Sequence, residues 1–475
     1  MDFSTWLVIA YLFTVLGVMA TVLSENRNPL KASAWIMIVG LVPVFGIMLY
    51  VVFGQDQRRL HSINRRFNRR VMRKPQVLTL PKHLQKKRPS HAQHRQLIEL
   101  LETNSQSSLL QVQSMDIYAW GEDMYEALFS DLEKAEEYIH LQAYIFAPDA
   151  VLDRLSDILI RKASEGVSVR VIYDHLGSYN VSKSVWNRLR EAGVQVYAFM
   201  RVVFPLLSTT VNYRNHRKIV VIDGRIGYVG GMNFAQRYLT GNDLGKWRDT
   251  HFRLTGVAVA GLQSSFLIDW YAVSRRVVNI DRYLAPATEP NEYSPSIQFV
   301  PGGPISMWRT IEQAIIYMIS RADNSICIQT PYFLPTENLN NAIITAALAG
   351  IKVELMLPRR TDSRLTTYAA CSYLEQLLEA GVRVFFYDRG FLHSKLLIVD
   401  DRVSTIGSAN MDFRSLEHNF EISGFVYDEG TARRLHTLFD QDKQACSELT
   451  ISGWSKRGRL ERFAESVMRL FAPLL

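Results

Sequence analysis

The sequence predicts an α/β fold built from two similar halves, preceded by an apolar N-terminal segment. Three observations support this prediction. Apolar runs of strand length alternate with helical patterns from residue 115 onward. A block of chemically distinctive residues occurs twice with the same internal spacing. Two uncharged apolar runs, at residues 6–23 and 34–53, precede the alternating region.

The two N-terminal apolar runs are each close to the roughly 20 residues that a helix needs to span a bilayer. They predict a transmembrane hairpin over residues 1–54, with helices at about 5–23 and 34–53. A cleaved signal peptide is the alternative for the first run. The absence of Lys or Arg before that run, and the second run soon after it, favour a retained hairpin. Pro43 and Gly46 are tolerated in a membrane helix and can kink it.

Positive charge is concentrated directly after the second apolar run, in a predicted basic juxtamembrane and linker region at 55–114. Residues 54–95 contain thirteen Lys or Arg and one acid, Asp56, although the whole chain has a net charge of only +8. The rest of the chain is therefore net negative, which argues against a nucleic-acid partner. The positive-inside rule predicts a multi-pass membrane protein whose later domains face the cytoplasm. The basic region acts as a topology determinant, as a contact for anionic headgroups, or as both.

The remaining chain alternates between strand and helix patterns, and the alternation occurs twice. The first half has predicted strands at 138–146, 167–173 and 194–199 and predicted helices at 152–165 and 183–192. The second half repeats the order, with strands at 326–333 and 353–357. We therefore predict two domains at 115–284 and 297–475, joined by a Pro-rich linker at 285–296.

Two further segments each have two interpretations. Residues 200–215 are an apolar and aromatic insertion in the first half, either a packed surface loop or an apolar wall beside the site. Residues 456–475 carry apolar residues at helical spacing together with basic residues. That segment is either a core helix or a helix lying on a membrane surface.

The repeated block contains the residues that carry the chemistry. The first copy has His216, Lys218, Asp223 and Asn233, with Gly230-Gly231 before the asparagine. The second copy has His393, Lys395, Asp400 and Asn410, with Gly407-Ser408 at the corresponding place. The apolar runs 219–222 and 396–399 between Lys and Asp are predicted to be buried strands.

These residue types suit phosphate chemistry. Histidine attacks or moves protons near neutral pH, and lysine offers a compact positive charge with three donors for phosphate oxygens. In an extended segment, residues two apart face the same side, which places His and Lys together. Because both copies match at every position, a coincidental His-x-Lys pair is a poor explanation.

This pattern, H-x-K-x4-D-x6-G-[GS]-x-N, resembles the signature of the phospholipase D superfamily. Together with the two N-terminal runs and the stretches Trp247–His251 and Asn419–Glu421, it resembles bacterial cardiolipin synthases. The resemblance implies two tandem phospholipase D-like domains, related by a pseudo-two-fold axis and building one site. It also implies phosphatidyl transfer between two phosphatidylglycerol molecules, which gives cardiolipin and glycerol at the bacterial inner membrane.

The resemblance also implies roles for individual residues. His216 is expected to be the nucleophile and His393 the acid/base, although the sequence itself does not distinguish them. Lys218, Lys395, Asn233 and Asn410 are expected to bind phosphate oxygens, and Asp249 and Glu421 to orient the imidazoles. Asp223 and Asp400 are grouped with the catalytic residues by the motif, but we expect them to be structural and to pair within the motif region. No metal or other cofactor is expected, and the chain has no G-x-x-x-x-G-K-[ST] loop for ATP.

Other functions fit the same residues. A hydrolase would use water in place of the second lipid, and a headgroup transferase would use another acceptor. A non-catalytic membrane scaffold that binds lipid is an alternative from another class, and a homodimer is compatible with the sequence. Cys327, Cys371 and Cys446 have no C-x-x-C spacing, so a reducing compartment without structural disulfides is expected.

Overall fold

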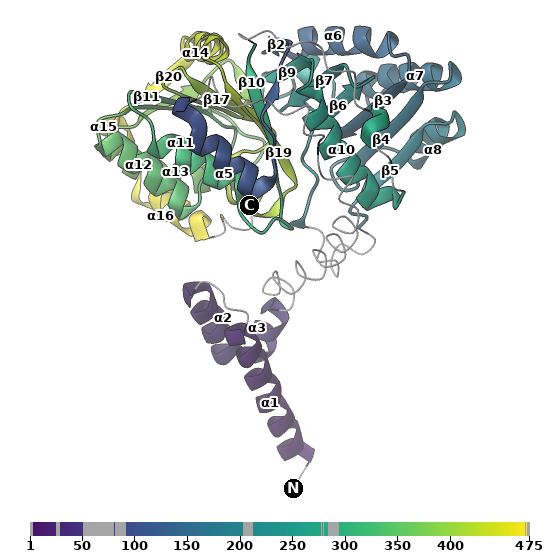
Figure 1. The fold of residues 1–475 in the computed structure, drawn as a ribbon. Coiled ribbons are helices and arrows are strands. Elements are labelled where there is room, and N and C mark those ends of the chain that lie inside the picture. Colours follow the sequence, from purple (N-terminus) through teal and green to yellow (C-terminus); the bar gives the residue numbers. More distant parts are fainter. Residues whose placement is uncertain are drawn as a thin grey trace. The chain divides into compact units, whose positions relative to one another are not determined.

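The computed structural model describes residues 3–24, 29–50, 80, 92–202, 212–276, 278, 280–283, 294–470 and 472. The chain forms two compact units, residues 1–73 with 202–211, and residues 74–201 with 212–475 (Figure 1). Most of the predicted basic region, most of the insertion at 200–215 and most of the linker at 285–296 lie outside the described residues.

In the described part of the N-terminal unit the chain forms three helices, α1 (Phe3–Ser24), α2 (Pro29–Leu41) and α3 (Pro43–Leu49). The predicted single helix at 34–53 is therefore wrong, because the chain breaks at Val42. Pro43 disfavours helical geometry at the preceding residue, and Val42 has φ −130° and ψ 70°. Helix α3 then packs closely on α2, since a Cβ on Gly46 would lie 2.5 Å from the carbonyl oxygen of Ile38. Among the described residues, no helix meets both the length and the apolarity that a membrane span requires.

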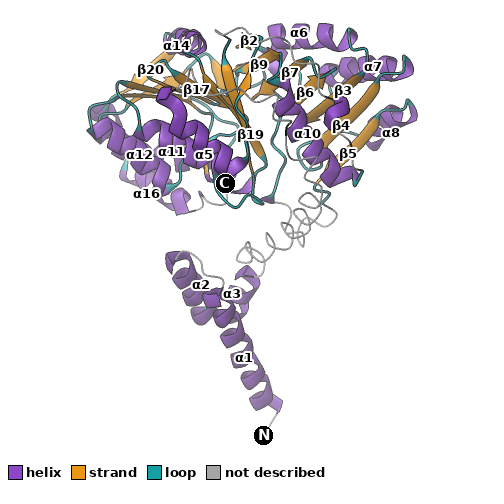
Figure 2. Cartoon of the chain, in the orientation of Figure 1, coloured by secondary structure: helices purple, strands orange, loops and turns teal. Residues whose placement is uncertain are grey.

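The larger unit contains two large mixed β-sheets flanked by helices (Figure 2), and two short two-stranded pairings besides. The first half supplies a seven-stranded sheet in the order β2-β9-β7-β6-β3-β4-β5. These strands are β2 (Ser114–Tyr118), β3 (Tyr138–Ala143), β4 (Ser168–Asp174), β5 (Gln195–Phe199), β6 (Ile219–Ile222), β7 (Ile226–Gly230) and β9 (His251–Thr255). Its helices are α6 (Gly121–Glu133), α7 (Ala150–Ser164), α8 (Lys183–Glu191), α9 (Arg237–Thr240) and α10 (Val259–Ser274). Strands β3, β4 and β5 are parallel and are connected through α7 and α8.

The second half forms a nine-stranded sheet in the order β1-β10-β19-β17-β16-β11-β13-β14-β20. The strands are β1 (Leu110–Gln111), β10 (Ser296–Gly302), β11 (Ser325–Gln329), β13 (Lys352–Pro358), β14 (Arg383–Tyr387), β16 (Leu396–Val399), β17 (Val403–Gly407), β19 (Glu421–Tyr427) and β20 (Cys446–Leu449). The helices are α11 (Thr310–Ser320), α12 (Glu337–Leu348), α13 (Arg364–Glu379), α14 (Glu429–Lys443), α15 (Ile451–Trp454) and α16 (Arg459–Leu470). In Figure 1, α11, α12 and α13 cover one face of this sheet, and α14 lies at the other.

The two sheets have the same internal order. Reading from β2 to β5 in the first sheet corresponds to reading from β10 to β14 in the second, with β1 and β20 as extra edge strands. In this correspondence β6 matches β16, and both have the bounds predicted from sequence, 219–222 and 396–399. The duplicated α/β fold predicted from the sequence is confirmed at this level.

One segment of the predicted linker packs on the second half. Helix α5 (Arg95–Ser105) and strand β1 precede the first half in sequence, but they pack on the second. Leu97, Ile98 and Leu101 of α5 are buried in the hydrophobic core of the second half. Residues 92–111 are therefore part of the second half's domain, and the predicted linker at 55–114 was drawn too long.

The C-terminal segment forms α16, which packs against α13. Arg457 forms an ion pair with the buried Glu465, and Met468 and Ala472 join the core of the second half. Leu460, Phe463 and Leu470 are exposed on the same helix. One side of the predicted C-terminal helix is thus a core contact, while another side remains apolar and open.

Candidate active site

The two halves are joined by short backbone pairings next to the motif histidines. Strand β15 (Gly390–Leu392) pairs in parallel with β8 (Lys246–Arg248), and the N–H of His393 donates to the carbonyl of Arg248 at 2.7 Å. On the other side Asn215 pairs with Phe420, and the N–H of His216 donates to the Phe420 carbonyl at 2.9 Å. In the opposite half, the residue after each paired carbonyl is an acid, Asp249 after Arg248 and Glu421 after Phe420. Each pairing therefore places an acid beside a motif histidine.

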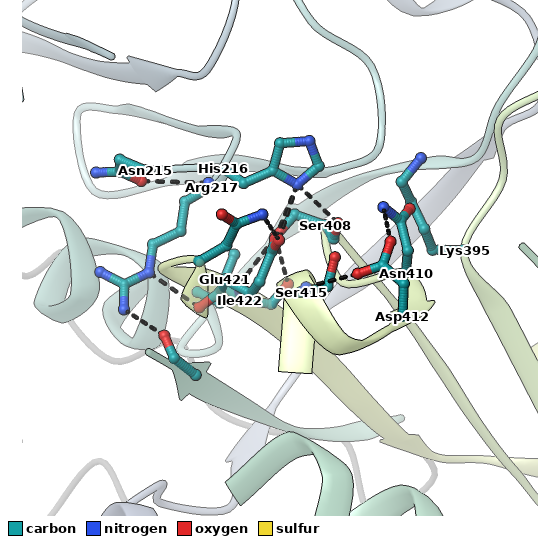
Figure 3. Close-up of polar contacts among 12 residues, drawn as sticks. Asn215, His216, Arg217, Lys395, Ser408, Asn410, Asp412, Ser415, Glu421 and Ile422 are labelled. Carbon is teal, nitrogen blue, oxygen red and sulfur yellow. Dashed lines mark hydrogen bonds and ion pairs between the residues drawn. The ribbon is translucent and has the colours of Figure 1, made fainter. Parts of the chain in front are cut away.

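These pairings give each imidazole a carboxylate from the other half. Nδ1 of His216 lies 3.0 Å from Glu421 and 3.1 Å from the Ser408 carbonyl oxygen (Figure 3). Nδ1 of His393 lies 2.6 Å from Asp249. Both carboxylates are fully buried. The sequence singled out Asp249 and Glu421 as orienting groups, but it did not indicate that they would exchange partners between the halves.

The local backbone makes room for these acids differently in the two halves. A Cβ on Gly231 would lie 2.1 Å from a carboxylate oxygen of Asp249, so glycine is needed for the close approach. The second half has Ser408 at the corresponding position, and its hydroxyl donates to Glu421. The Asp249–Gly231 contact and the Glu421–Ser408 contact therefore occupy equivalent places in the two halves but differ in chemistry.

Burial and charge keep both imidazoles neutral. Burial lowers the pKa of His216, and Lys218 lowers it further, although Glu421 opposes both. Burial and Lys395 lower the pKa of His393 to about 3. Burial also works against the ionised forms of Asp249 and Glu421. Lys395 and His393 more than offset this effect at Asp249, and the pKa of its carboxyl lies below the usual range. His216 and Lys218 do the same for the pKa of Glu421.

A carboxylate at Nδ1 fixes the imidazole tautomer. Because Asp249 and Glu421 are ionised, the Nδ1 atom of each imidazole carries the proton that the carboxylate accepts. The Nε2 atom of each ring is then left with its lone pair. A neutral imidazole with a free Nε2 is the form that can attack an electrophile or accept a proton.

Each motif lysine is hydrogen-bonded to the backbone of the histidine two residues before it. Nζ of Lys218 donates to the carbonyl oxygen of His216 at 2.6 Å, and Nζ of Lys395 donates to the carbonyl oxygen of His393. Burial lowers the pKa of Lys218 well below its usual value and that of Lys395 to about 8. Both lysines therefore lose a proton more readily than a lysine exposed to water.

The motif asparagines border the site but are already hydrogen-bonded. Asn233 accepts from the N–H of Ile145 and donates to the hydroxyl of Tyr238. Asn410 donates to Asp412 at 3.0 Å, and its carbonyl oxygen has no partner among the described residues. Binding of a phosphate by these amides would therefore replace or extend existing bonds.

Both histidines open onto one cavity of about 530 Å³. Its walls include the motif residues His216, His393, Asn233 and Asn410. An aromatic ring flanks each imidazole, Tyr144 at 4.9 Å from His216 and Trp247 at 5.1 Å from His393 between ring centroids. The cavity is also lined by residues outside the predicted site, Arg214, Arg237, Tyr332, Asp362 and Arg414.

The motif aspartates lie away from this cavity. The carboxylate of Asp223 accepts hydrogen bonds from the backbone N–H groups of Glu136, Glu137 and Tyr138, where β3 begins. Asp400 does the same for Asp323, Asn324 and Ser325, where β11 begins. Grouping these aspartates with the catalytic residues is therefore corrected. Their expected structural role fits the geometry, but their partners are backbone groups about 80 residues earlier in the chain.

We expect Asp223→Ala to lower the free energy of unfolding by about 2 to 4 kcal/mol, because three backbone donors lose a charged acceptor. Asp223 also has φ +51°, a left-handed conformation that Asn tolerates better than Ala. Asp223→Asn should therefore be the milder variant. Chemical denaturation of both variants measures the effect, and equal stability of Asp223→Ala and the parent would contradict the assignment.

The fold and the paired histidines define a phospholipase D-like protein with two motif-bearing halves. A solved structure of phosphatidylserine synthase from Haemophilus influenzae Rd KW20 is similar in fold, with a TM-score of 0.61 and 16% identity over 80% of this chain and 98% of that chain. A family model described as "Cardiolipin synthase, PLD-like domain" matches residues 128–244 and 315–443. The chain belongs to the cardiolipin synthase family.

Relatives along nearly the whole chain support this membership. Cardiolipin synthase 2 of Bacillus anthracis is 39% identical over 457 residues, which cover 95% of this chain and 88% of the relative. Major cardiolipin synthase ClsA of Bacillus subtilis (strain 168) is 38% identical over 475 residues, which cover 98% of each.

Proposed function

We propose that this enzyme joins two phosphatidylglycerol molecules into cardiolipin and glycerol through a phosphatidyl-histidine intermediate. The observation that carries the proposal is the pair of neutral imidazoles facing one cavity, each held at Nδ1 by a carboxylate of the opposite half. The family relationship supports the same reaction, since the relatives are named cardiolipin synthases.

In the first half-reaction, Nε2 of His216 attacks the phosphorus of one phosphatidylglycerol. A P–N bond forms, and the bond from phosphorus to the glycerol headgroup oxygen breaks. For this step His393 carries a proton on Nε2 as well, because the anionic phosphate that binds beside it favours the imidazolium form. His393 gives that proton to the leaving glycerol oxygen, glycerol departs, and the imidazole becomes neutral again. The buried Glu421 then stabilises the substituted His216 ring through its Nδ1 proton.

In the second half-reaction, His393 removes the proton from a headgroup hydroxyl of the second phosphatidylglycerol. The resulting oxygen attacks the same phosphorus, the P–N bond breaks, and cardiolipin forms while His216 returns to its neutral state. One phosphodiester replaces another, so the balance needs no oxidant, reductant or nucleotide. Lys218, Lys395, Asn233 and Asn410 are proposed to stabilise the phosphoryl oxygens.

We further propose that the N-terminal unit associates with the bacterial inner membrane, where these lipids reside. Exposed apolar side chains on its helices, such as Phe13, Leu16, Leu41 and Val44, support membrane association. The basic stretch at 54–95 would then face the cytoplasm beside the anionic headgroups. The two-pass topology stays a prediction from the sequence.

The purified full-length enzyme, supplied with phosphatidylglycerol alone in mixed micelles, tests the reaction. Cardiolipin and glycerol in equal amounts are the expected products. Phosphatidic acid as the main product would instead favour the hydrolase. The absence of any turnover would favour a lipid-binding scaffold.

Activity should have a defined pH dependence. The pKa of Lys395 is lowered to about 8, so its positive charge is present below that pH and is lost above it. We therefore expect kcat/KM to fall as the pH rises through about 8. Because arginine keeps its charge, Lys395→Arg should move the alkaline limb upward. A profile of kcat/KM between about pH 5 and about pH 10 checks this, and an unmoved alkaline limb in the variant would contradict it.

A further inference from the structure

Two arginines of the cavity occupy equivalent positions in the two halves. Arg237 follows Asn233 by four residues, and Arg414 follows Asn410 by four residues. Both line the cavity that the two motif histidines share. The motif repeat therefore extends to an N-x3-R pair, one member on each side of the pseudo-two-fold relationship.

The two arginines are free to meet a ligand. Within the described chain neither guanidinium takes part in an ion pair, and Nε of Arg237 is buried without a hydrogen-bond partner. The third arginine of the cavity, Arg214, is instead paired with the buried Asp174 at 3.3 Å. The motif lysines donate to backbone carbonyls of their own segments. Arg237 and Arg414 are thus the cationic side chains of the cavity that are best placed to bind an anionic group of a ligand.

Each arginine is associated with a different histidine. The Arg237 guanidinium lies 4.7 Å from the centre of the Trp247 ring, which flanks His393. Arg414 lies on the His216 side, because its backbone carbonyl accepts the N–H of Asn419, the residue directly before Phe420, and the Phe420 carbonyl accepts the N–H of His216. The cavity therefore has one arginine on the nucleophile side and one on the acid/base side.

The proposed reaction requires two phosphates in the cavity at the same time. One is the phosphate that becomes attached to His216. The other belongs to the acceptor lipid, and only the three carbons of a glycerol separate it from the hydroxyl that His393 activates. A buried second phosphate needs a positive partner, and a guanidinium binds phosphate oxygens in a two-pronged manner.

We infer that Arg237 binds the phosphate of the acceptor phosphatidylglycerol and thereby selects a phospholipid over water or free glycerol as the acceptor. Arg414, on the His216 side, binds the phosphate that is being transferred. This inference rests on the proposed function, because it assigns the acceptor subsite of that reaction. The alcohol of the acceptor is then positioned by its own phosphate rather than by contacts to its hydroxyl alone.

Isotope exchange separates the acceptor subsite from the rest of the site. Incorporation of labelled glycerol into phosphatidylglycerol uses the first half-reaction and its reversal, and no second phosphate enters the cavity. Cardiolipin synthesis uses the same first half-reaction followed by a phosphate-bearing acceptor. The ratio of synthesis to exchange therefore measures recognition of the acceptor's phosphate.

We expect Arg237→Gln to lower this ratio by about 10- to 100-fold, the loss of one charge-assisted contact. Arg237→Lys should restore part of the ratio. In the matched variant Arg414→Gln, synthesis and exchange should fall together, which leaves the ratio near the parent value. An unchanged ratio in Arg237→Gln, or an equal loss of ratio in Arg414→Gln, would overturn the inference. Failure of the parent enzyme to form cardiolipin would instead count against the proposed function.

Discussion

Replacing His216 by alanine is expected to reduce cardiolipin formation by at least about 10⁴-fold and to prevent any covalent phosphatidyl-enzyme from forming. Without the imidazole the cavity lacks the group that forms the P–N bond in the proposed reaction. His393→Ala should behave differently, because His216 is retained. That variant should form the phosphatidyl-enzyme slowly and then accumulate it, since nothing activates the acceptor hydroxyl.

Intact-mass measurement after mixing with phosphatidylglycerol distinguishes these outcomes. His175→Gln is a suitable control, because His175 is not among the residues that line the cavity. Accumulation of the covalent species in His216→Ala, with none in His393→Ala, would reverse the assignment of nucleophile and acid/base. Full synthase activity in His216→Ala would exclude the covalent mechanism.

The second large effect concerns the exchanged carboxylates. Asp249→Asn should lower activity by about 10³- to 10⁴-fold, because an amide can no longer hold the Nδ1 proton of its histidine in the required tautomer. Asp249 lies in the first half, but its carboxylate is hydrogen-bonded to Nδ1 of His393 in the second. The variant should therefore resemble His393→Ala and accumulate the phosphatidyl-enzyme.

Glu421→Gln provides the matched comparison. Its partner is His216, so this variant should resemble His216→Ala and form little covalent species. A single mass-spectrometric experiment on both variants tests the exchange of partners. If each carboxylate served the histidine of its own half, the two variants would show the opposite phenotypes.

The sequence predicted those parts of the site that depend on local pattern. Strands 219–222 and 396–399 have the predicted bounds, because a short apolar run between polar residues is buried wherever the sheet places it. The prediction that acids beyond the motifs approach the histidines also agrees with the geometry. The equal spacing of the two motif copies is visible in the sequence itself, so these features could be predicted without the structure.

Features that depend on contacts between distant segments were not predicted. The exchange of Asp249 and Glu421 follows from the pairing of β15 with β8, and these strands are more than 140 residues apart in sequence. The packing of α5 on the second half also depends on a distant core. Arg237 and Arg414 share a sequence signal, the same spacing from the motif asparagine in both halves, but arginine is too common a residue for that spacing alone to identify them.

The exchange of partners across the halves has a consequence for how this molecule can change over evolutionary time. Two identical subunits would be bound to carry the same acid beside every imidazole. A single chain that contains both copies is free of that symmetry, and here one copy pairs aspartate with glycine while the other pairs glutamate with serine. Covalent tandem duplication thus allows the two rings to differ, as the proposed division into attack and proton transfer requires.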